Sequence, residues 1–344
     1  MVYQAAIVGC GRIASDFDDD PLMKKLYGIA THAGGYKDNP RVELVAAADI
    51  SPEKLQKFGK RWDVGRLYTD YKQMLKENKV DILSICTWNS THLELLEQAA
   101  KSGVKAAFCE KPISNSIRNA ERMIEIANAN NIKLAVNHSR RWDELYQNVA
   151  DLIKNGELGE IQQVSCYYTA GIANTCSHLF DVLRMFLGDA ISVNALIKDA
   201  LLKDDPNMDG YIRFKNGATA VIQSLDVKKY TIFEFDIYGT NGRLRIVDNG
   251  FNVAYWESAP SNKYLNYNEL FLSEPPLRVE PKSIIKNAVQ DIVDCLDLSR
   301  QPRCTGEDGI KALEIICAFH LSAGLNGMTV DLPLKNRDLV IKSK

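Results

Sequence analysis

Short apolar runs alternate with amphipathic segments over the first part of the chain. The runs lie at residues 4–8, 42–48, 80–86, 104–109 and 132–136. Apolar residues at helical spacing predict helices between them, near residues 52–61, 90–102 and 114–129. Strands that alternate with helices in this way favour a parallel, doubly wound α/β sheet.

The rhythm changes after about residue 140, where strands follow one another without helices between them. These strands are expected at residues 191–198, 210–215, 218–227, 231–239, 243–247 and 252–256. Helices of the same region are expected near residues 143–154, 177–187, 282–299 and 306–325. Asn216-Gly217 and Asn241-Gly242 are typical of hairpin turns. The pattern therefore predicts an α+β region with an open, mostly antiparallel sheet.

The length of 344 residues favours two domains, because single hydrophobic cores rarely grow so large. We place the first at residues 1–138 and the second at residues 139–344. Strands of the second domain carry large side chains on both faces, as in Tyr211-Ile212-Arg213-Phe214. A sheet covered on one side only by its own helices leaves an apolar face to be buried in a second copy of the chain. We therefore expect a homodimer or homotetramer.

The composition is that of a globular protein, with 46% hydrophobic and 25% charged residues. A formal charge of −2 gives no bulk attraction to nucleic acid or to an anionic membrane, and neither is expected as a partner. No apolar stretch has the length of a bilayer-spanning helix, so a cytoplasmic protein is expected.

Metal binding is not expected. The eight cysteines are widely spread and form no C-x-x-C pair, which favours buried thiols over a zinc site. The acidic run at residues 16–20 resembles the start of a calcium loop, but Pro21 stands at the sixth position, where that loop needs glycine.

A glycine-rich turn follows the first apolar run. Its residues are Gly9-Cys10-Gly11-Arg12-Ile13-Ala14, the form G-x-G-x-x-A. In a strand-to-helix turn, the first glycine permits the bend, the second lets a pyrophosphate approach the backbone, and the small Ala14 allows close helix packing. Glycine-rich turns are common, so this pattern alone is a weak signal of dinucleotide binding.

An acidic residue, Asp49, ends the second apolar run. A carboxylate there accepts hydrogen bonds from the adenosine ribose and repels a 2′-phosphate, so NAD is expected in preference to NADP. Asp49 lies farther from the glycines than the usual spacing of about twenty residues. The excess falls in residues 15–30, which we interpret as an insertion ahead of Thr31.

The most informative residue is Lys111, between Glu110 and Pro112 at the end of the apolar run 104–109. The proline disfavours helix at the residue before it, which leaves the lysine at the carboxyl edge of the predicted sheet. Open α/β sheets bind their ligands at that edge. An ammonium group there can hold a substrate hydroxyl or carbonyl oxygen beside a nicotinamide ring.

Two more polar segments follow apolar runs at the same edge. The first is Thr87-Trp88-Asn89-Ser90-Thr91-His92, which can offer a ligand hydroxyls, amides and a helix N-terminus, or can simply cap the next helix. The second contains Arg140 and Arg141. Paired arginines suit an anionic or polyhydroxylated ligand, but arginines are also common at surfaces.

A histidine at the start of a later predicted helix is the candidate proton acceptor. His178 and Asp181 are three residues apart and share a helical face, with Asn174 one turn earlier. An imidazole near a nicotinamide and a lysine can take the hydroxyl proton as hydride leaves the same carbon. The alternative is a histidine that only pairs with its own helix, with Asp181 bound to Arg184.

Taken together, these motifs resemble the Gfo/Idh/MocA family of oxidoreductases, and Glu110-Lys111-Pro112 is the most specific of them. The resemblance covers nearly the whole chain and implies a Rossmann domain followed by an open, mostly antiparallel sheet. It assigns the cofactor to Gly9, Cys10, Gly11, Arg12, Ile13, Asp49, Thr87, Trp88, Asn89, His92, Glu110 and Lys111. It assigns the substrate to Lys111, Arg141, Asn174, His178 and Asp181.

By the same resemblance, Lys111 polarises the substrate hydroxyl and His178 is the general base. Two positions depart from the family pattern. Asn174 stands where many relatives have an aspartate, and Trp88 where many have a proline. An amide can orient an imidazole but cannot stabilise its cation by charge. Either Asp181 supplies that charge, or His178 is a weaker base than usual.

The expected activity is NAD-dependent oxidation of a secondary alcohol in a sugar, sugar derivative or cyclitol. One alternative is an oxidoreductase that keeps its nucleotide bound and cycles it between two substrates. Another is a non-catalytic NAD-binding sensor or assembly subunit, since function does not follow from fold alone.

Overall fold

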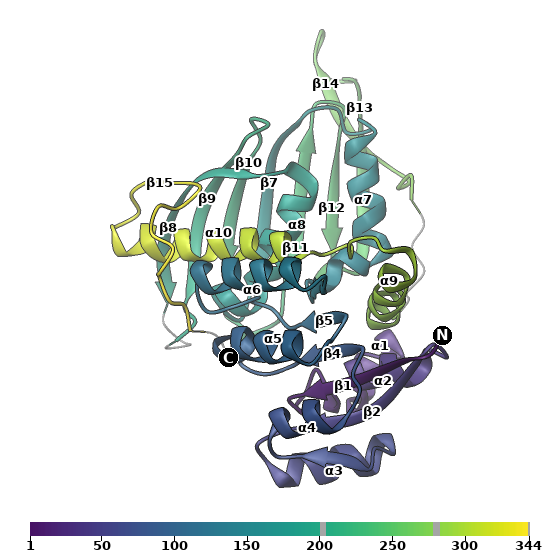
Figure 1. Cartoon of the computed structure of the whole chain (residues 1–344). Helices are drawn as coiled ribbons and strands as arrows, with labels where there is room; N and C mark the ends of the chain where they lie inside the picture. The colour runs from purple at the N-terminus through teal and green to yellow at the C-terminus, as the bar shows by residue number, and fades with distance from the viewer. Residues whose placement is uncertain (200–203, 278–282, 343–344) are drawn as a thin grey trace. The chain divides into compact units, whose positions relative to one another are not determined.

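The structure is a computed structural model that describes residues 1–199, 204–277 and 283–342 (Figure 1). Its internal contacts divide the chain into two compact units. The first unit comprises Met1–Asp143 and a later stretch that ends at Ile310, and the second comprises the remaining residues. The long helix α9 (Ile284–Leu298) therefore belongs to the first unit, although it follows the second unit's sheet in sequence.

The first unit is built on a six-stranded sheet whose paired strands are all parallel. Its strands are β1 (Tyr3–Val8), β2 (Val42–Ala48), β3 (Arg66–Tyr68), β4 (Ile82–Ile85), β5 (Ala106–Cys109) and β6 (Lys133–Val136). Their order in the sheet is β3-β2-β1-β4-β5-β6. This confirms the doubly wound parallel sheet. The order reverses between β1 and β4, the point at which such sheets bind ligands.

Helices cover both faces of this sheet. They are α2 (His32–Asp38), α3 (Pro52–Trp62), α4 (Tyr71–Glu77), α5 (His92–Lys101), α6 (Ile117–Ala129) and α9. α2 contacts α3 and α9, whereas α5 contacts α4 and α6, so the two groups lie on opposite faces. Side chains cap two of these helices: Ser51 accepts from the backbone of α3, and Ser116 from that of α6.

Residues 15–30 form the insertion that the sequence suggests. The glycines are followed by a hydrogen-bonded turn at residues 12–15, and the chain returns to this turn at α2. There the backbone N–H groups of His32 and Ala33 donate to the carbonyl oxygens of Ile13 and Ala14, each at 3.1 Å. The start of α2 is therefore bound to the glycine turn, and the inserted residues loop out between the two.

The inserted segment contains the short helix α1 (Pro21–Tyr27) and is anchored at both ends. Asp18 accepts hydrogen bonds from the Ala30 N–H and the Thr31 hydroxyl, both at 2.6 Å. Asp16 pairs with Lys57 of α3 at 2.9 Å. The insertion is thus a folded element attached to α3.

The second unit is built on a nine-stranded sheet. Its strands are β7 (Ile161–Tyr168), β8 (Ala190–Asp199), β9 (Asn207–Phe214), β10 (Thr219–Ser224), β11 (Phe233–Gly239), β12 (Gly242–Val247), β13 (Asn252–Pro260), β14 (Asn268–Ser273) and β15 (Val330–Asp331). The order is β14-β13-β12-β11-β7-β10-β9-β8-β15, and every pair except β7 with β10 is antiparallel. This confirms the mostly antiparallel sheet.

Helices lie on one face of the nine-stranded sheet. They are α7 (Glu144–Lys154), α8 (Cys176–Leu187) and α10 (Gly306–Gly324), as Figure 1 shows. Phe235 on the covered face meets Tyr146 of α7 and Phe186 of α8 edge to face, each with ring centroids 6.2 Å apart. These aromatic contacts join both helices to the sheet.

The other face of the sheet mixes ion pairs with aromatic rings. Asp236 accepts two hydrogen bonds from Arg243, at 2.8 and 2.6 Å. The Arg243 guanidinium lies 4.5 Å from the ring centroid of Trp256, a cation–π contact. This face is therefore polar as well as aromatic, unlike the apolar face that the sequence suggests.

No helix in the described ranges of the chain has the length and apolar character needed to cross a bilayer.

Candidate active site

The glycine turn has the geometry that a diphosphate requires. Gly9 has a φ of +92°, and a Cβ there would lie 2.5 Å from the carbonyl oxygen of Cys86, so only glycine fits. A Cβ on Gly11 would meet nothing within 4 Å, which leaves its backbone open to a ligand. Ala14 is fully buried beneath the turn. All three positions have the local geometry that a diphosphate-binding turn needs.

Asp49 is held against this turn at the end of β2. Its carboxylate accepts hydrogen bonds from the backbone N–H groups of Cys10 at 2.7 Å and Ser51 at 2.9 Å. A carboxylate has about four lone-pair sites, so both oxygens can also accept from ribose hydroxyls. The glycine turn and this carboxylate together fit a dinucleotide without a 2′-phosphate.

Glu110 and Lys111 lie at the carboxyl edge of the same sheet, two strands from the glycine turn. The Glu110 N–H donates to the Ile85 carbonyl at 2.9 Å, which extends the ladder between β4 and β5. Glu110 is buried, and its Oε1 accepts hydrogen bonds from His32 at 3.0 Å and from Asn137 at 2.6 Å. Lys111 follows directly, so a fixed residue precedes the proposed catalytic lysine.

The pKa of Glu110 reflects opposing effects. Burial raises the pKa, but hydrogen bonds from His32 and Asn137 and the positive charge of Lys111 outweigh it, and the pKa lies below its usual value. Glu110 is therefore a carboxylate at neutral pH.

A chain of buried hydrogen bonds extends from Glu110 into the domain. The Nδ1 atom of His32 lies 2.8 Å from the Ser84 hydroxyl, which lies 2.6 Å from the Tyr36 hydroxyl. His32, Ser84 and Tyr36 are all completely buried. The sequence does not reveal this chain, because its members come from α2, β4 and the segment after β5.

The turn after β4 is fixed from behind by His92. One ring nitrogen of His92 lies 3.1 Å from the Thr87 carbonyl, and the other lies 3.1 Å from the Ile113 carbonyl and 3.2 Å from the Cys109 thiol. Burial lowers the pKa of His92, so the ring is neutral at pH 7. A neutral ring donates from one nitrogen and accepts a hydrogen bond at the other, and of these three neighbours only the Cys109 thiol can donate that bond. His92 thus joins the Thr87 turn to the residues after Pro112.

The other residues expected in this turn differ in exposure. Trp88 is 56% exposed, whereas Asn89 is buried and its side-chain amide lies 3.5 Å from the Ser114 carbonyl. Ser90 and Thr91 are exposed as well, and Trp88 is the large apolar side chain of this turn that faces solvent.

Arg141, expected to contact the substrate, is paired within the first unit. Its guanidinium lies 3.0 Å from Asp308. The other Asp308 oxygen accepts from the N–H and hydroxyl of Thr305, at 3.0 and 2.9 Å. A ligand that binds to the Arg141 guanidinium therefore does so beside the ion pair with Asp308.

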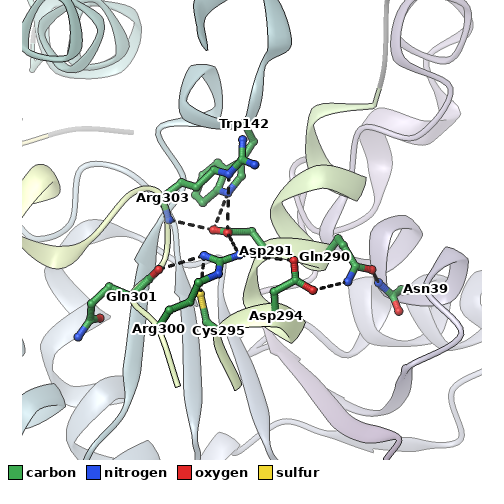
Figure 2. Close-up of polar contacts among 9 residues, drawn as sticks. All are labelled: Asn39, Trp142, Gln290, Asp291, Asp294, Cys295, Arg300, Gln301 and Arg303. Atoms are coloured by element: carbon green, nitrogen blue, oxygen red, sulfur yellow. Dashed lines mark hydrogen bonds and ion pairs between the residues drawn. The ribbon is translucent and has the colours of Figure 1, made fainter. Parts of the chain in front are cut away.

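The neighbouring Trp142 is held by α9, as Figure 2 shows. Asp291 of α9 accepts hydrogen bonds from the Trp142 indole N–H and the Arg303 backbone N–H, both at 2.9 Å. Arg300 lies 2.6 Å from the other Asp291 oxygen and neutralises this buried carboxylate. The cluster fixes the segment that follows β6.

The second unit holds the candidate base. His178 lies in the first turn of α8, directly after a π-helical segment, Gly171–Thr175, that contains Asn174. Asp181 is buried one turn later. Arg184, the alternative partner for Asp181, forms an ion pair with Asp189 at 3.0 Å.

The sequence gives no sign of a carboxylate that holds the start of this helix. Asp205 is buried, and it accepts from the backbone N–H groups of Ala173 at 2.7 Å and Asn174 at 2.9 Å. A Cβ on Gly171 would lie 2.2 Å from an Asp205 oxygen, so glycine is required there. Asp205, from the segment before β9, therefore holds the backbone that leads into the helix of His178.

A parallel sheet with a glycine turn, a carboxylate held against that turn and a lysine at its carboxyl edge is typical of a dinucleotide-binding oxidoreductase. The chain belongs to the GFO/IDH/MocA oxidoreductase family. The model of its NAD-binding Rossmann fold matches residues 3–138, and that of its C-terminal domain matches residues 146–245.

Relatives with assigned activities align with most of the chain. A D-apiose dehydrogenase of Paraburkholderia graminis is 24% identical and covers 96% of this chain and 90% of its own. A myo-inositol 2-dehydrogenase of Thermotoga maritima is 24% identical, with 82% and 89% covered. A crystal structure of an Agrobacterium radiobacter oxidoreductase with NAD+, L-tartaric acid and magnesium is 23% identical, covers 96% of this chain and 98% of its own, and has a TM-score of 0.76.

Proposed function

We propose that this chain is an NAD-dependent dehydrogenase acting on a secondary alcohol of a sugar, sugar derivative or cyclitol. Family membership and the activities in the relatives' names support this reaction class. The observation that carries the proposal is Lys111, which follows the fixed Glu110 at the sheet edge that also presents the glycine turn.

In the proposed reaction, Lys111 and His178 act on the same hydroxyl group. The Lys111 ammonium donates a hydrogen bond to the substrate oxygen and stabilises negative charge that develops there. His178 takes the hydroxyl proton as general base. NAD, when bound, accepts the hydride from the same carbon. Asp49 holds the adenosine ribose and excludes a 2′-phosphate, so NAD is preferred to NADP.

The experiment that tests this proposal is turnover with a panel of sugars, uronic acids, nucleotide sugars and inositols, followed by NADH absorbance. Lys111→Ala should reduce turnover by roughly 10²- to 10⁴-fold, because a group that stabilises the transition state is lost. NAD affinity should stay close to that of the wild type. Full activity of the variant would remove Lys111 from the mechanism.

The same assay separates the two alternatives. An enzyme that keeps its nucleotide reduces one equivalent of NAD per chain and then stops until a second substrate oxidises the nucleotide. A non-catalytic sensor binds NAD and reduces none with any member of the panel. Continuous NADH release supports the dehydrogenase.

We also propose that the chain assembles as a cytoplasmic homodimer or homotetramer through the uncovered face of the nine-stranded sheet. Tyr211 on β9 is 39% exposed, and the charges of Asp236 and Arg243 are paired within the face. Paired charges can be buried at an interface more readily than single ones. Light scattering should give a multiple of the chain mass for the wild type, and a smaller mass for Tyr211→Glu. A monomeric wild type would contradict this.

A further inference from the structure

We propose that His32 is a positioning residue for the reaction: by fixing the Glu110 carboxylate, it sets the place and charge state of the adjacent Lys111 ammonium. This inference rests on the proposed role of Lys111. His32 lies 78 residues before Glu110 in sequence and meets it only through the fold.

The His32 ring is held at both nitrogens and on one face. Nε2 lies 3.0 Å from Glu110, and Nδ1 lies 2.8 Å from the Ser84 hydroxyl. Its centroid is 4.2 Å from that of Phe108, and Phe108 packs edge to face on Trp142 at 5.9 Å. A ring constrained in this way holds its hydrogen-bond partner in one place.

The hydrogen bonds have one consistent direction when His32 is neutral. An ionised Glu110 can only accept, so His32 donates from Nε2. Nδ1 then accepts from the Ser84 hydroxyl, and Ser84 accepts from Tyr36. The same logic orients Asn137, because only its NH₂ group can donate to the Glu110 oxygen 2.6 Å away.

This chain has no outlet to solvent at its far end, because Tyr36 is completely buried. It therefore fits a fixed support better than a proton relay. The support delivers two donors to one carboxylate oxygen, which favours the ionised form of Glu110.

The charge of Glu110 acts on the residue that follows it. The titratable or polar groups that interact with Glu110 lie on α2, on the segment after β4, on the residues beside Glu110 and on the segment after β6. They are His32, Cys86, His92, Cys109, Lys111 and Asn137. Among these groups, Lys111 is the one whose side-chain type is ordinarily cationic at neutral pH. Loss of the Glu110 charge should therefore destabilise the Lys111 ammonium and lower its pKa.

The test measures the Lys111 titration without any substrate. The protein is reductively methylated with ¹³C, and the Lys111 signal is assigned with Lys111→Arg and followed by NMR against pH. Glu110→Gln should lower the Lys111 pKa by roughly one unit or more. His32→Leu should shift it in the same direction, and His32→Gln, which can still donate to Glu110, should shift it less.

A second readout uses turnover with the best member of the sugar and cyclitol panel. His32→Leu should lower kcat on the order of 10- to 100-fold, since a small misplacement of a catalytic group has that effect. KM for NAD should change little, and the alkaline limb of the kcat profile should move to lower pH. Tyr3→Phe, which removes the hydrogen bond to Asp297, is the matched control and should change neither readout.

The two proposals fail in different ways. An unchanged Lys111 titration in both Glu110→Gln and His32→Leu overturns the role of His32, whatever the activity. If Lys111→Ala keeps full activity while these titrations shift as expected, the proposed dehydrogenase mechanism fails, and His32 still sets the charge state of Lys111.

Discussion

At the scale of single residues, Asp49 makes the most specific prediction about the cofactor. Asp49→Ala removes the proposed ribose acceptor and frees the Cys10 N–H that it holds. A hydrogen bond to a charged group contributes about 1.5–3 kcal/mol, so NAD affinity should fall by roughly ten- to a hundredfold. The preference over NADP should narrow, because the repulsion of a 2′-phosphate is lost.

Calorimetric titration with both nucleotides measures this change. Asp70→Ala is a suitable control, because Asp70 also accepts a backbone hydrogen bond but does so at the start of α4. An unchanged ratio of NAD to NADP affinity in Asp49→Ala would remove Asp49 from the ribose site.

Asn174 gives a second prediction at this scale. Restoring the family aspartate by Asn174→Asp should lower both activity and melting temperature. The new carboxylate cannot donate to the Ala170 carbonyl, as the amide does at 3.2 Å, and it adds a second negative charge beside Asp205. Asn174→Ala, which adds no charge, should be milder. Higher activity in Asn174→Asp would contradict this reading of Asp205.

The sequence identifies residues that stand in local motifs, and it misses residues that reach the site from elsewhere. The glycine turn, Asp49 and Glu110-Lys111-Pro112 can be found because residue type and position after an apolar run suffice. His32 and Asp205 cannot be found in this way. Each meets its partner through the fold, more than thirty residues away in sequence.

At the scale of elements, the inserted segment makes a prediction of its own. Asp18→Ala removes both hydrogen bonds that close the insertion, to Ala30 and Thr31. The segment should open more often, and trypsin should cut faster after Lys24 and Lys25, which are exposed on α1. The rest of the domain should keep its melting temperature within a few degrees.

Timed digestion followed by mass spectrometry detects this cleavage. Asp38→Ala, which removes a surface ion pair with Lys286 on another part of the same unit, is the control. Equal cleavage rates in wild type and Asp18→Ala would indicate that other contacts hold the insertion.

Element prediction succeeds for long periodic segments and fails for short ones. The helices expected near residues 52–61 and 177–187 are found as α3 and α8. α4 has only seven residues, too few to show a helical period. β7 is not predicted either, for a different reason. It lies at the centre of its sheet, but exposed glutamines at residues 162 and 163 interrupt its apolar pattern.

At the scale of the whole molecule, buried titratable groups predict that acid destabilises the fold. Burial lowers the pKa values of His92 and His320, so both bind protons less readily when folded. Stability from these groups is present above the unfolded value of about 6.5 and is lost as pH falls below it. Glu110, whose pKa is also lowered, adds to the loss below about pH 4.3.

Melting temperature measured from pH 8 to pH 5 at constant ionic strength tests this expectation. It should be steady above about pH 7 and fall toward pH 5. His320→Leu, which cannot be protonated, should fall less steeply than the wild type. A flat profile down to pH 5 would contradict the assignment of neutral, buried histidines.

The chain's division into units is only partly visible in the sequence. The change from alternating strands and helices to consecutive strands indicates two regions, and each has the expected kind of sheet. The place of α9 in the first unit is not visible, because it depends on long-range contacts such as Trp142 with Asp291. Such contacts leave no periodic pattern.

The most direct test of the central claim is transfer of deuterium to NAD. A substrate found in the panel is prepared with deuterium on the carbon that bears the oxidised hydroxyl, and the nucleotide is analysed by mass spectrometry. The proposed mechanism predicts singly deuterated NADH from the wild type and a loss of roughly 10²-fold or more in Lys111→Ala. Undeuterated NADH, or equal rates in both proteins, would contradict it.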